Sequence, residues 1–185
     1  MSKRLFVSVD LDGLAEEVAT VQDRFADAAG LRFTDPEQAH VTLKFLGDTD
    51  PDRIPELTDE LSAAVETAGV DPFTLAVEDL GVFPSLDYIS VVWVGAGAGS
   101  AELATLHEAV EARTVAMGYD AEDHEFTPHA TIARMDHAGG KELVQKRVRE
   151  DGPEVGELRV EEVRLKESVL GSDGPTYTTV ERFRL

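Results

Sequence analysis

The 185-residue sequence predicts an α+β fold: a two-lobed, pseudo-twofold duplicated domain with antiparallel sheets facing a central cleft and helices packed outside. One observation is a four-residue pattern that occurs twice, as His40-Val41-Thr42-Leu43 and His129-Ala130-Thr131-Ile132. The copies begin 89 residues apart, and each follows a helix-like segment and a loop containing Phe-Thr and a proline. Hairpin-like and helical segments are also mixed along the chain. We therefore expect residues 1–185 to form one domain of two intertwined lobes.

The N-terminal segments lead to the first copy of the pattern. Valine and phenylalanine make 4–10 a predicted buried strand. Apolar residues at helical spacing predict a helix over 14–29, with Asp12 as its N-cap and Gly30 after its end. A proline-containing loop then precedes a predicted strand at 39–46.

A second helix and a set of strands follow. The spacing of apolar residues predicts a helix from Asp52 to about Gly69. The predicted strands are 73–77, 80–83 and 88–94, the last two joined by a hairpin turn. The glycine-rich stretch 95–99 lacks the lysine and the spacing of nucleotide-binding loops, so we interpret it as a turn.

The C-terminal part repeats the alternation of helices and strands. A helix is predicted from its cap Ser100 to Met117, and the second copy of the pattern is expected in a strand at 128–134. The remaining predicted elements are a helix at 141–150 and strands at 157–165 and 176–183, with an irregularity near Glu161-Glu162.

Each copy of the pattern can present a polar pair from one face of a strand. Side chains alternate between the faces of an extended strand, so each histidine shares a face with the threonine two residues later. Imidazole exchanges protons near neutral pH, and hydroxyl groups donate hydrogen bonds to anions. Two such pairs indicate phosphoester chemistry without a metal. The alternative is a pair of structural histidines bonded to neighbouring hydroxyls.

The segments around both copies resemble known signature sequences. His40-Val41-Thr42-Leu43-Lys44-Phe45-Leu46-Gly47 and Thr127-Pro128-His129-Ala130-Thr131-Ile132-Ala133-Arg134 resemble those of the 2H phosphoesterase superfamily. They are most similar to its RNA 2′,3′-cyclic phosphodiesterase branch, historically called 2′-5′ RNA ligase. Segments 4–10, 166–170 and 174–177 are similar to that branch as well, so the resemblance spans nearly the whole chain and implies the same two-lobed arrangement.

The resemblance implies hydrolysis of RNA or nucleotide 2′,3′-cyclic phosphate ends to 2′-phosphomonoesters, with no cofactor and no metal. In the implied roles, His40 donates a proton to the leaving 3′ oxygen and His129 accepts one from water. Thr42 and Thr131 bind the nonbridging phosphate oxygens. The implied partners are RNAs with cyclic phosphate ends, tRNA fragments among them. The residues alone do not distinguish the acid from the base.

Two cations near the patterns are candidates for binding the substrate. The guanidinium of Arg134 matches a phosphate group bidentately, but its strand parity is opposite to that of His129. A bend after Ile132 is needed to bring it to the same face. Lys44 shares parity with His40, so we expect it on that face, either binding substrate or solvated.

Three aromatic residues are candidates for stacking on bases, because stacking tolerates any base. They are Phe6, Phe45 and Tyr177, although for the two phenylalanines we favour packing in the core over stacking. We expect the other histidines, His107, His124 and His137, to lie outside the site. A metal site at His124 is a weaker alternative, because the acidic loop has no standard ligand spacing.

The net charge of the chain indicates the salt concentration at which the protein works. The chain has 17 Lys and Arg against 37 Asp and Glu, a net charge of −20, and only five of the cations are lysine. The electrostatic field of this negative charge repels RNA over a Debye length of about 8 Å at physiological salt, and the Debye length falls to about 3 Å at 1 M salt. The scattered acids therefore favour a protein adapted to concentrated salt over one that binds a cationic partner.

Other compositional features narrow the class of protein. There are no cysteines, which excludes disulfides and thiolate chemistry. The sequence has no signal-like start and no run of eighteen apolar residues, so we expect a cytoplasmic monomer with no membrane partner. Two functions remain alternatives to hydrolysis: 2′-5′ RNA ligation, and non-catalytic binding of RNA ends.

Overall fold

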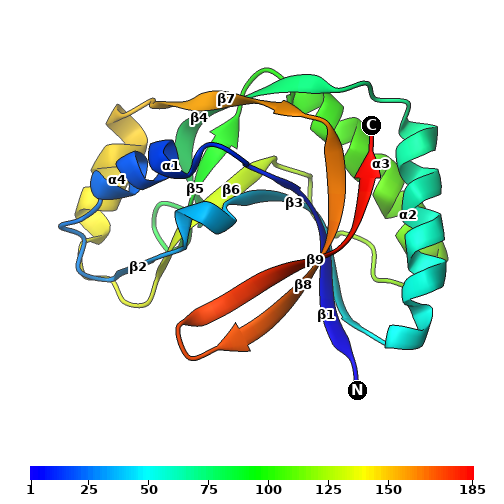
Figure 1. Ribbon diagram of the computed structural model, residues 1–185. Coiled ribbons are helices and arrows are strands. Elements are labelled where there is room, and N and C mark those ends of the chain that lie inside the picture. Colours follow the sequence, from blue (N-terminus) through cyan, green and yellow to red (C-terminus); the bar gives the residue numbers. More distant parts are fainter.

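The computed structural model describes residues 1–185 and confirms the α+β class, with four α-helices and nine strands in one antiparallel sheet (Figure 1). The strands are β1 (Lys3–Asp10), β2 (Leu31–Phe33), β3 (His40–Thr49), β4 (Phe73–Pro84), β5 (Ile89–Ala96), β6 (His129–Met135), β7 (Glu154–Val160), β8 (Glu162–Gly171) and β9 (Gly174–Arg184). The helices are α1 (Ala15–Asp23), α2 (Ile54–Ala68), α3 (Ser100–Ala116) and α4 (Lys141–Glu150), with 3₁₀ turns at Pro36–Gln38 and Pro51–Arg53.

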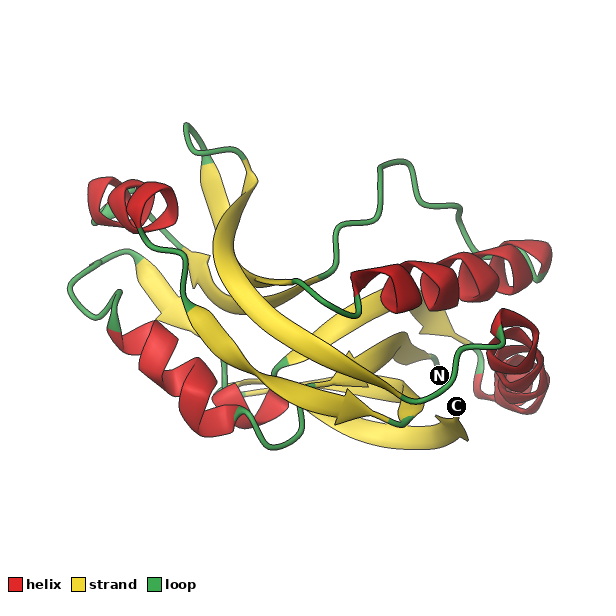
Figure 2. Cartoon of the chain, turned by 90° about the horizontal axis from the view of Figure 1, so that it is seen from above, coloured by secondary structure: helices red, strands yellow, loops and turns green.

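The two predicted sheets are halves of one continuous sheet. Its strand order is β7-β4-β5-β6-β3-β1-β8-β9, with β2 added to β6. The halves meet where β3 pairs with β6, through the single residue pair Val41 and Ala130. One half is covered by α2 and α3 and the other by α1 and α4, so the helices form two groups at opposite ends of the molecule (Figure 2).

The chain crosses between the halves several times. Helix α1 follows β1 in the sequence but packs against β6 and β7 of the other half. Helix α3 follows β5 but packs against β3. As a result, α1 lies behind β6, which carries the second motif, and α3 lies behind β3, which carries the first.

The predicted strand 157–165 is wrong, because it is two strands in different halves of the sheet. Strand β7 pairs with β4, while β8 pairs with β1, and the chain crosses at the exposed Glu161. Apolar residues alternate on both sides of this crossing, so periodicity alone joined the two. The predicted strands 73–77 and 80–83 are likewise one strand, β4, which is irregular at Asp79, whose φ is 68°.

The first helix is shorter than predicted, ending at Asp23, after which the chain continues in tight turns that bury Phe25 completely. Asp12 does not cap it; the carboxylate of Asp12 instead accepts a hydrogen bond of 2.6 Å from Arg164. Residues 31–33, expected in a loop, form β2 because they pair with β6.

The core lies between the helices and one side of the sheet. It includes fully buried side chains from all four helices, such as Val18, Leu57, Leu103 and Val144. Burying one such side chain stabilises the fold by roughly 1.5–3 kcal/mol. Val41, Leu43, Ala130 and Ile132 of the repeated pattern belong to this core, so the opposite side of the sheet carries the polar residues of the pattern. We call that side the motif face.

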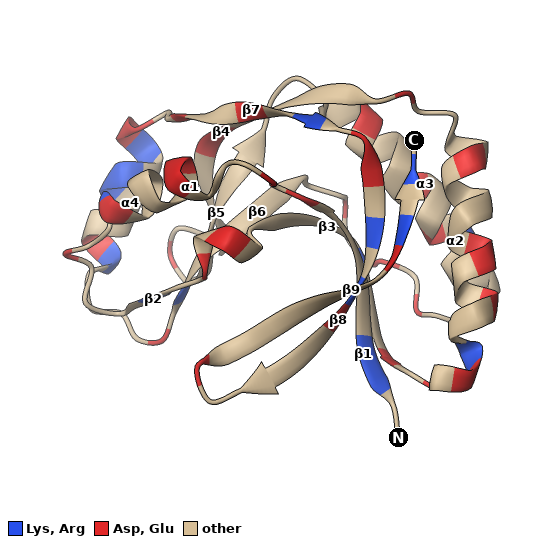
Figure 3. Cartoon of the chain, viewed as in Figure 1, with Lys and Arg blue, Asp and Glu red and all other residues tan.

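Acidic side chains are distributed over helices, strands and loops, with no single acidic tail (Figure 3). Ten of the 17 cations form ion pairs with carboxylates. No helix is both long and apolar enough to cross a membrane.

Candidate active site

The two motif strands share a local irregularity. Along β3 and β6 buried and partly exposed residues alternate at first, and then two consecutive residues are buried: Leu43 and Lys44, or Ile132 and Ala133. In each case the pairing with the neighbouring strand slips by one residue at this point. Leu43 and Ile132 are thus the extra residues of two β-bulges, which exchange the faces of the side chains that follow, in β3 as far as a second slip of the pairing at Leu46.

The two His-Thr pairs lie together on the motif face. Val41 is paired with Ala130, and continuing this antiparallel register places His40 opposite Thr131 and Thr42 opposite His129. A local twofold axis between Val41 and Ala130 therefore relates the two copies, as predicted from the duplication. Neither threonine hydroxyl donates to or accepts from another protein group, so both are free to bind a ligand.

Each imidazole is held by the backbone two residues before it. Nδ1 of His40 lies 2.9 Å from the carbonyl oxygen of Gln38, and Nδ1 of His129 lies 2.6 Å from that of Thr127. A carbonyl oxygen only accepts hydrogen bonds, so Nδ1 carries the proton in the neutral form of both rings. Nε2 is then the atom that can accept or deliver a proton at the motif face.

Aromatic rings enclose both histidines. The ring of His40 lies 5.0 Å from Phe6 and 5.1 Å from Tyr177, measured between ring centroids. Phe6 is only 3% exposed, but it contacts these rings and not the core cluster. The expected burial of Phe6 is therefore confirmed, but it packs among the rings around His40 and not in the main core cluster.

His129 has two aromatic neighbours that sequence reasoning missed. Its ring lies 4.9 Å from Phe83 and 5.7 Å from Trp93. The indole of Trp93 lies against Gly81, where an added Cβ would come within 2.1 Å of the ring, so only glycine fits there. The sequence did not single out Trp93, because every residue of the apolar run 88–94 is equally compatible with a core strand.

Burial lowers the pKa of both imidazoles. For His40 the loss of solvent is the largest cause, the Gln38 carbonyl and the Asp10 carboxylate act to raise the pKa, and the charges of Lys166 and His129 lower it. For His129 the loss of solvent again dominates over the Thr127 carbonyl. The charge of His129 acts on the pKa of His40, so the two rings lie within electrostatic range of each other.

Arg134 lies on the motif face, because the bulge at Ile132 supplies the required bend. It is exposed and has no carboxylate partner. The hydroxyl of Tyr177 has its pKa raised by burial and lowered in part by the positive charges of Arg134 and Arg4. Both arginines therefore lie near Tyr177, and neither forms an ion pair.

The prediction that Lys44 shares a face with His40 is wrong. The same type of bulge turns Lys44 into the core, where it is 2% exposed and its Nζ lies 2.8 Å from Glu111 of α3. Nζ also donates to the carbonyl oxygen of Asp120. Phe45 takes the place expected for Lys44: it is 65% exposed, and its ring lies 6.2 Å from that of Phe6.

The remaining histidines differ from one another. His124 and His137 are exposed, and Nδ1 of His124 lies 3.0 Å from the carboxylate of Asp123. His107 is buried, and its Nδ1 donates to the carbonyl oxygen of Leu43 at 2.8 Å. His107 therefore lies outside the motif face, as expected, but it is buried and bonds to the backbone of the first motif strand.

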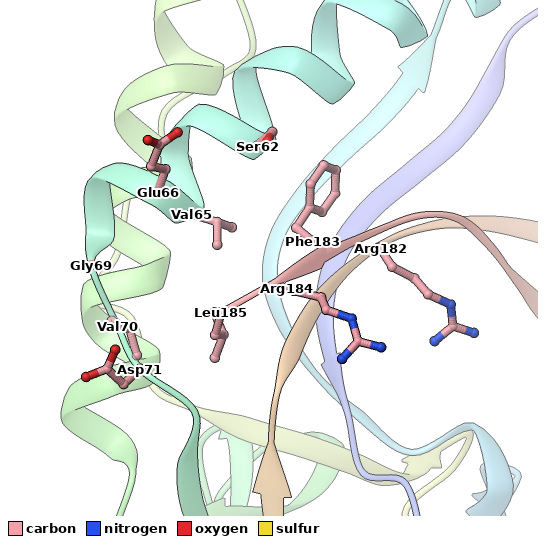
Figure 4. A pocket seen from close by; sticks show the side chains of 10 residues that line it. All are labelled: Ser62, Val65, Glu66, Gly69, Val70, Asp71, Arg182, Phe183, Arg184 and Leu185. Atoms are coloured by element: carbon pink, nitrogen blue, oxygen red, sulfur yellow. The ribbon is translucent and has the colours of Figure 1, made fainter.

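A pocket of about 460 Å³ lies away from the His-Thr pairs, between α2 and the end of β9 (Figure 4). Its walls include Glu66, Asp71, Arg184 and Leu185. None of the motif residues reaches it, so it has no part in the chemistry of the two histidines.

The arrangement is shared with known proteins. Residues 11–169 match the family model of the 2′-5′ RNA ligase superfamily. A Methanothermobacter thermautotrophicus protein named RNA 2′,3′-cyclic phosphodiesterase is 35% identical over 188 residues, covering 100% of both chains. An Aeropyrum pernix protein of the same name is also 35% identical, over 81% of this chain and 84% of its own.

Solved structures show the same fold. A crystal structure of a Thermus thermophilus protein has a TM-score of 0.80 and 28% identity, covering 98% of this chain and 97% of its own. Escherichia coli LigT has a TM-score of 0.80 at 23% identity, covering 100% and 99% of the two chains. The match over residues 11–169 and the full-length relatives establish that this chain belongs to the 2′-5′ RNA ligase superfamily, the 2H phosphoesterases.

Proposed function

We propose that the protein hydrolyses 2′,3′-cyclic phosphate ends of RNA to 2′-phosphomonoesters by acid–base catalysis between His40 and His129, without a metal ion. The observation that carries the proposal is the matched pair of imidazoles, each with Nδ1–H bonded to the carbonyl two residues earlier. Both Nε2 atoms are thereby left as proton-transfer atoms on one face of the sheet. Hydrolysis of a cyclic diester needs such an acid and such a base on opposite sides of phosphorus.

The threonines supply the anion-binding groups. Thr42 and Thr131 lie on the motif face beside the opposite histidine, and their hydroxyls are free of protein partners. The two hydroxyl groups donate hydrogen bonds to the nonbridging oxygens of the phosphate. These bonds stabilise the negative charge that develops on those oxygens in the transition state.

The surroundings of the two rings support His40 as the proton donor to the 3′ oxygen and His129 as the acceptor from water. Asp10 lies opposite His40 in the β1–β3 register, and its charge raises the pKa of that ring. The residue opposite His129 is Gly95, which offers no carboxylate. Of the two, His40 is therefore the ring with a carboxylate beside it, one that Arg164 and Lys166 also bind.

An RNA chain has suitable contacts on the motif face. Arg134 and Arg4, two unpaired cations in a protein of net charge −20, lie near Tyr177. Phe45 is an exposed ring on the same face for a base to stack on. The contacts come from one chain, so we expect the protein to act as a monomer, in the salt-rich cytoplasm that its acidic composition favours, on RNA ends including tRNA fragments.

The names of the relatives agree with this substrate. The two archaeal proteins that are 35% identical carry the name RNA 2′,3′-cyclic phosphodiesterase, and one of them is matched over its full length. At 35% identity over the full length of both chains, the first of these proteins supports the same substrate class for this one.

The test is hydrolysis of the four 2′,3′-cyclic nucleotides and of a short RNA with a cyclic end, in molar KCl with excess EDTA. We expect 2′-phosphomonoesters, identified by ³¹P NMR. His40→Ala and His129→Ala should each lower kcat by about 10²-fold or more, or about 2.7 kcal/mol of transition-state stabilisation. The double variant should lose much less than the sum, because either loss disables the pair. His137→Ala, at an exposed histidine, is the matched control.

Three results would contradict the proposal. Loss of activity in EDTA that one divalent ion restores would refute the metal-free mechanism. Binding of RNA ends with no turnover would assign a binding module. Formation of 2′-5′ joined products in preference to hydrolysis, with an RNA 5′-hydroxyl present, would assign a ligase.

A further inference from the structure

The bulges in β3 and β6 leave backbone groups outside the regular strand pairing. A bulged residue has no partner residue in the ladder, so its carbonyl needs another donor when it is buried. The two bulged residues, Leu43 and Ile132, are 2% and 0% exposed. A buried side chain from a helix bonds to each of their carbonyl oxygens.

His107 of α3 serves the first bulge. It is 9% exposed, and its Nδ1 donates to the Leu43 carbonyl at 2.8 Å. Its ring also stacks on Phe126, with centroids 4.2 Å apart and planes 6° from parallel. Phe126 adjoins Thr127, whose carbonyl holds the ring of His129. One side chain thus connects the bulge of the first motif to the loop that orients the histidine of the second.

Gln22 of α1 serves the second bulge in the same crossed manner. It is 7% exposed, and its Nε2 donates to the carbonyls of Ile132 at 3.0 Å and Thr34 at 2.8 Å. Thr34 binds the second motif strand through its backbone N–H to Ile132 and its hydroxyl to the Thr131 carbonyl. Thr34 opens the loop that ends in Gln38, whose carbonyl holds the ring of His40.

We infer that Gln22 and His107 are positioning residues for the reaction, each tying the bulge of one motif to the loop that orients the histidine of the other. The inference rests on the proposed function for its kinetic consequence. Without a bonded bulge, the strand can return to regular alternation, which would turn Arg134 or Phe45 away from the motif face. If the loop is not fixed, its carbonyl oxygen no longer stays in position to accept the hydrogen bond from Nδ1–H, and the imidazole is free to change tautomer.

The connections are crossed, so a change in one lobe affects the histidine of the other. This distinguishes positioning from general stability: a merely destabilising substitution affects both rings alike or neither. The connections are crossed because α1 and α3 each pack behind the half of the sheet that does not contain the strand preceding them.

The test compares variants that remove one contact at a time. His107→Phe keeps a ring on Phe126 but has no donor for Leu43, and His107→Leu removes both contacts. His107→Asn restores a donor near the Nδ1 position. Gln22→Met keeps the size of the side chain without its amide. Thr114→Val is the matched control: Thr114 is fully buried on α3, but its hydroxyl bonds only within its own helix.

We expect His107→Phe and Gln22→Met to lower kcat by about tenfold or more, a larger change than in KM, because catalysis is sensitive to displacements below about 1 Å. His107→Asn should recover part of the loss, and Thr114→Val should change kcat by less than about twofold on the same scale. All rates are compared well below each variant's Tm.

A second measurement does not depend on turnover. Long-range ¹H–¹⁵N spectra of the imidazoles, recorded above both pKa values, report which nitrogen is protonated. We expect the Nδ1–H form at both rings in the parent, a mixture at His40 in Gln22→Met, and a mixture at His129 in His107→Leu. Should Gln22→Met fail to fold, Thr34→Val removes only the Thr131 bond and takes its place.

Parent-like kcat and parent-like spectra in folded His107→Phe, His107→Leu and Gln22→Met would overturn the inference, and so would equal loss in Thr114→Val. If the parent protein hydrolysed no cyclic phosphate while the crossed spectral changes occurred, the proposed function would fail and the positioning roles would stand.

Discussion

The buried ion pair between Lys44 and Glu111 makes a sharp prediction about which cations act on substrate. The two side chains are 1% and 21% exposed, and their charged atoms are 2.8 Å apart. Glu111→Gln removes the compensating negative charge and leaves the buried Lys44 ammonium with neutral acceptors only, the substituted amide oxygen and the carbonyl of Asp120. Removing the charge of one partner of a buried pair costs about 3–5 kcal/mol, and the remaining neutral acceptors favour the lower value, about 3 kcal/mol.

That loss should be visible in melting. For a chain of 150–250 residues, each kcal/mol lowers Tm by about 2–4 °C, so Glu111→Gln should melt about 6–12 °C below the parent. Lys44→Met combined with Glu111→Leu replaces the pair by apolar side chains and should be neutral or stabilising. The exposed pair between Arg113 of α3 and Glu60 of α2 is the control, and Glu60→Gln should cost under about 1 kcal/mol.

The same variants test the role of Lys44. Since its ammonium lies on the core side, the Lys44→Met, Glu111→Leu double variant should keep its kcat/KM on cyclic nucleotides within about twofold of the parent. Thermal melts and initial rates on one preparation are sufficient. A stable double variant with kcat/KM reduced tenfold or more would show that Lys44 contacts substrate, and an unchanged Tm in Glu111→Gln would refute the buried pair.

Four further outcomes are expected. Because burial lowers the pKa of both His40 and His129 from 6.5, the bell-shaped pH profile of kcat/KM should centre below pH 6.5. The rate falls at low pH as the general base becomes protonated, and it falls at high pH as the general acid loses its proton. A profile centred above pH 6.5 would contradict the burial of the two rings. Thr42→Ala and Thr131→Ala should each cost about 1–3 kcal/mol in kcat/KM with Tm little changed, and parent-like rates would remove them from phosphate binding. If the guanidinium of Arg134 binds a phosphate of the RNA backbone bidentately, Arg134→Lys should lower kcat/KM more on RNA ends than on cyclic nucleotides. Equal losses on both substrates would indicate that Arg134 contacts only the reacting phosphate. Tm and rate should both rise from low salt to molar KCl as the −20 charge is screened, and a flat or falling response would favour a cationic partner over adaptation to salt.

Local patterns were enough to predict the fold class and the faces of the two His-Thr pairs. Within one regular strand, side-chain direction follows from counting, so His40 with Thr42, and His129 with Thr131, could be placed on one face from the sequence alone. The repeat of that pattern after matching loops predicted the twofold relation, which the β3–β6 register then confirmed.

Tertiary structure decided what lies beyond the fourth residue of each motif. A bulge forms where a strand's neighbours require it, and counting cannot detect it, so Lys44 was assigned to the wrong face and Phe45 to the core. Arg134 needed the same irregularity to reach the site.

Contacts between distant segments were equally out of reach. His107 and Leu43 are 64 residues apart in sequence, and Gln22 and Ile132 are 110 apart. A helix periodicity reports which side of a helix is apolar but not which strand it covers. Local alternation in the sequence therefore determined the two His-Thr pairs, while the crossing of α1 and α3 between the lobes, a property of the packed sheet, decided which side chains bond to the motif strands.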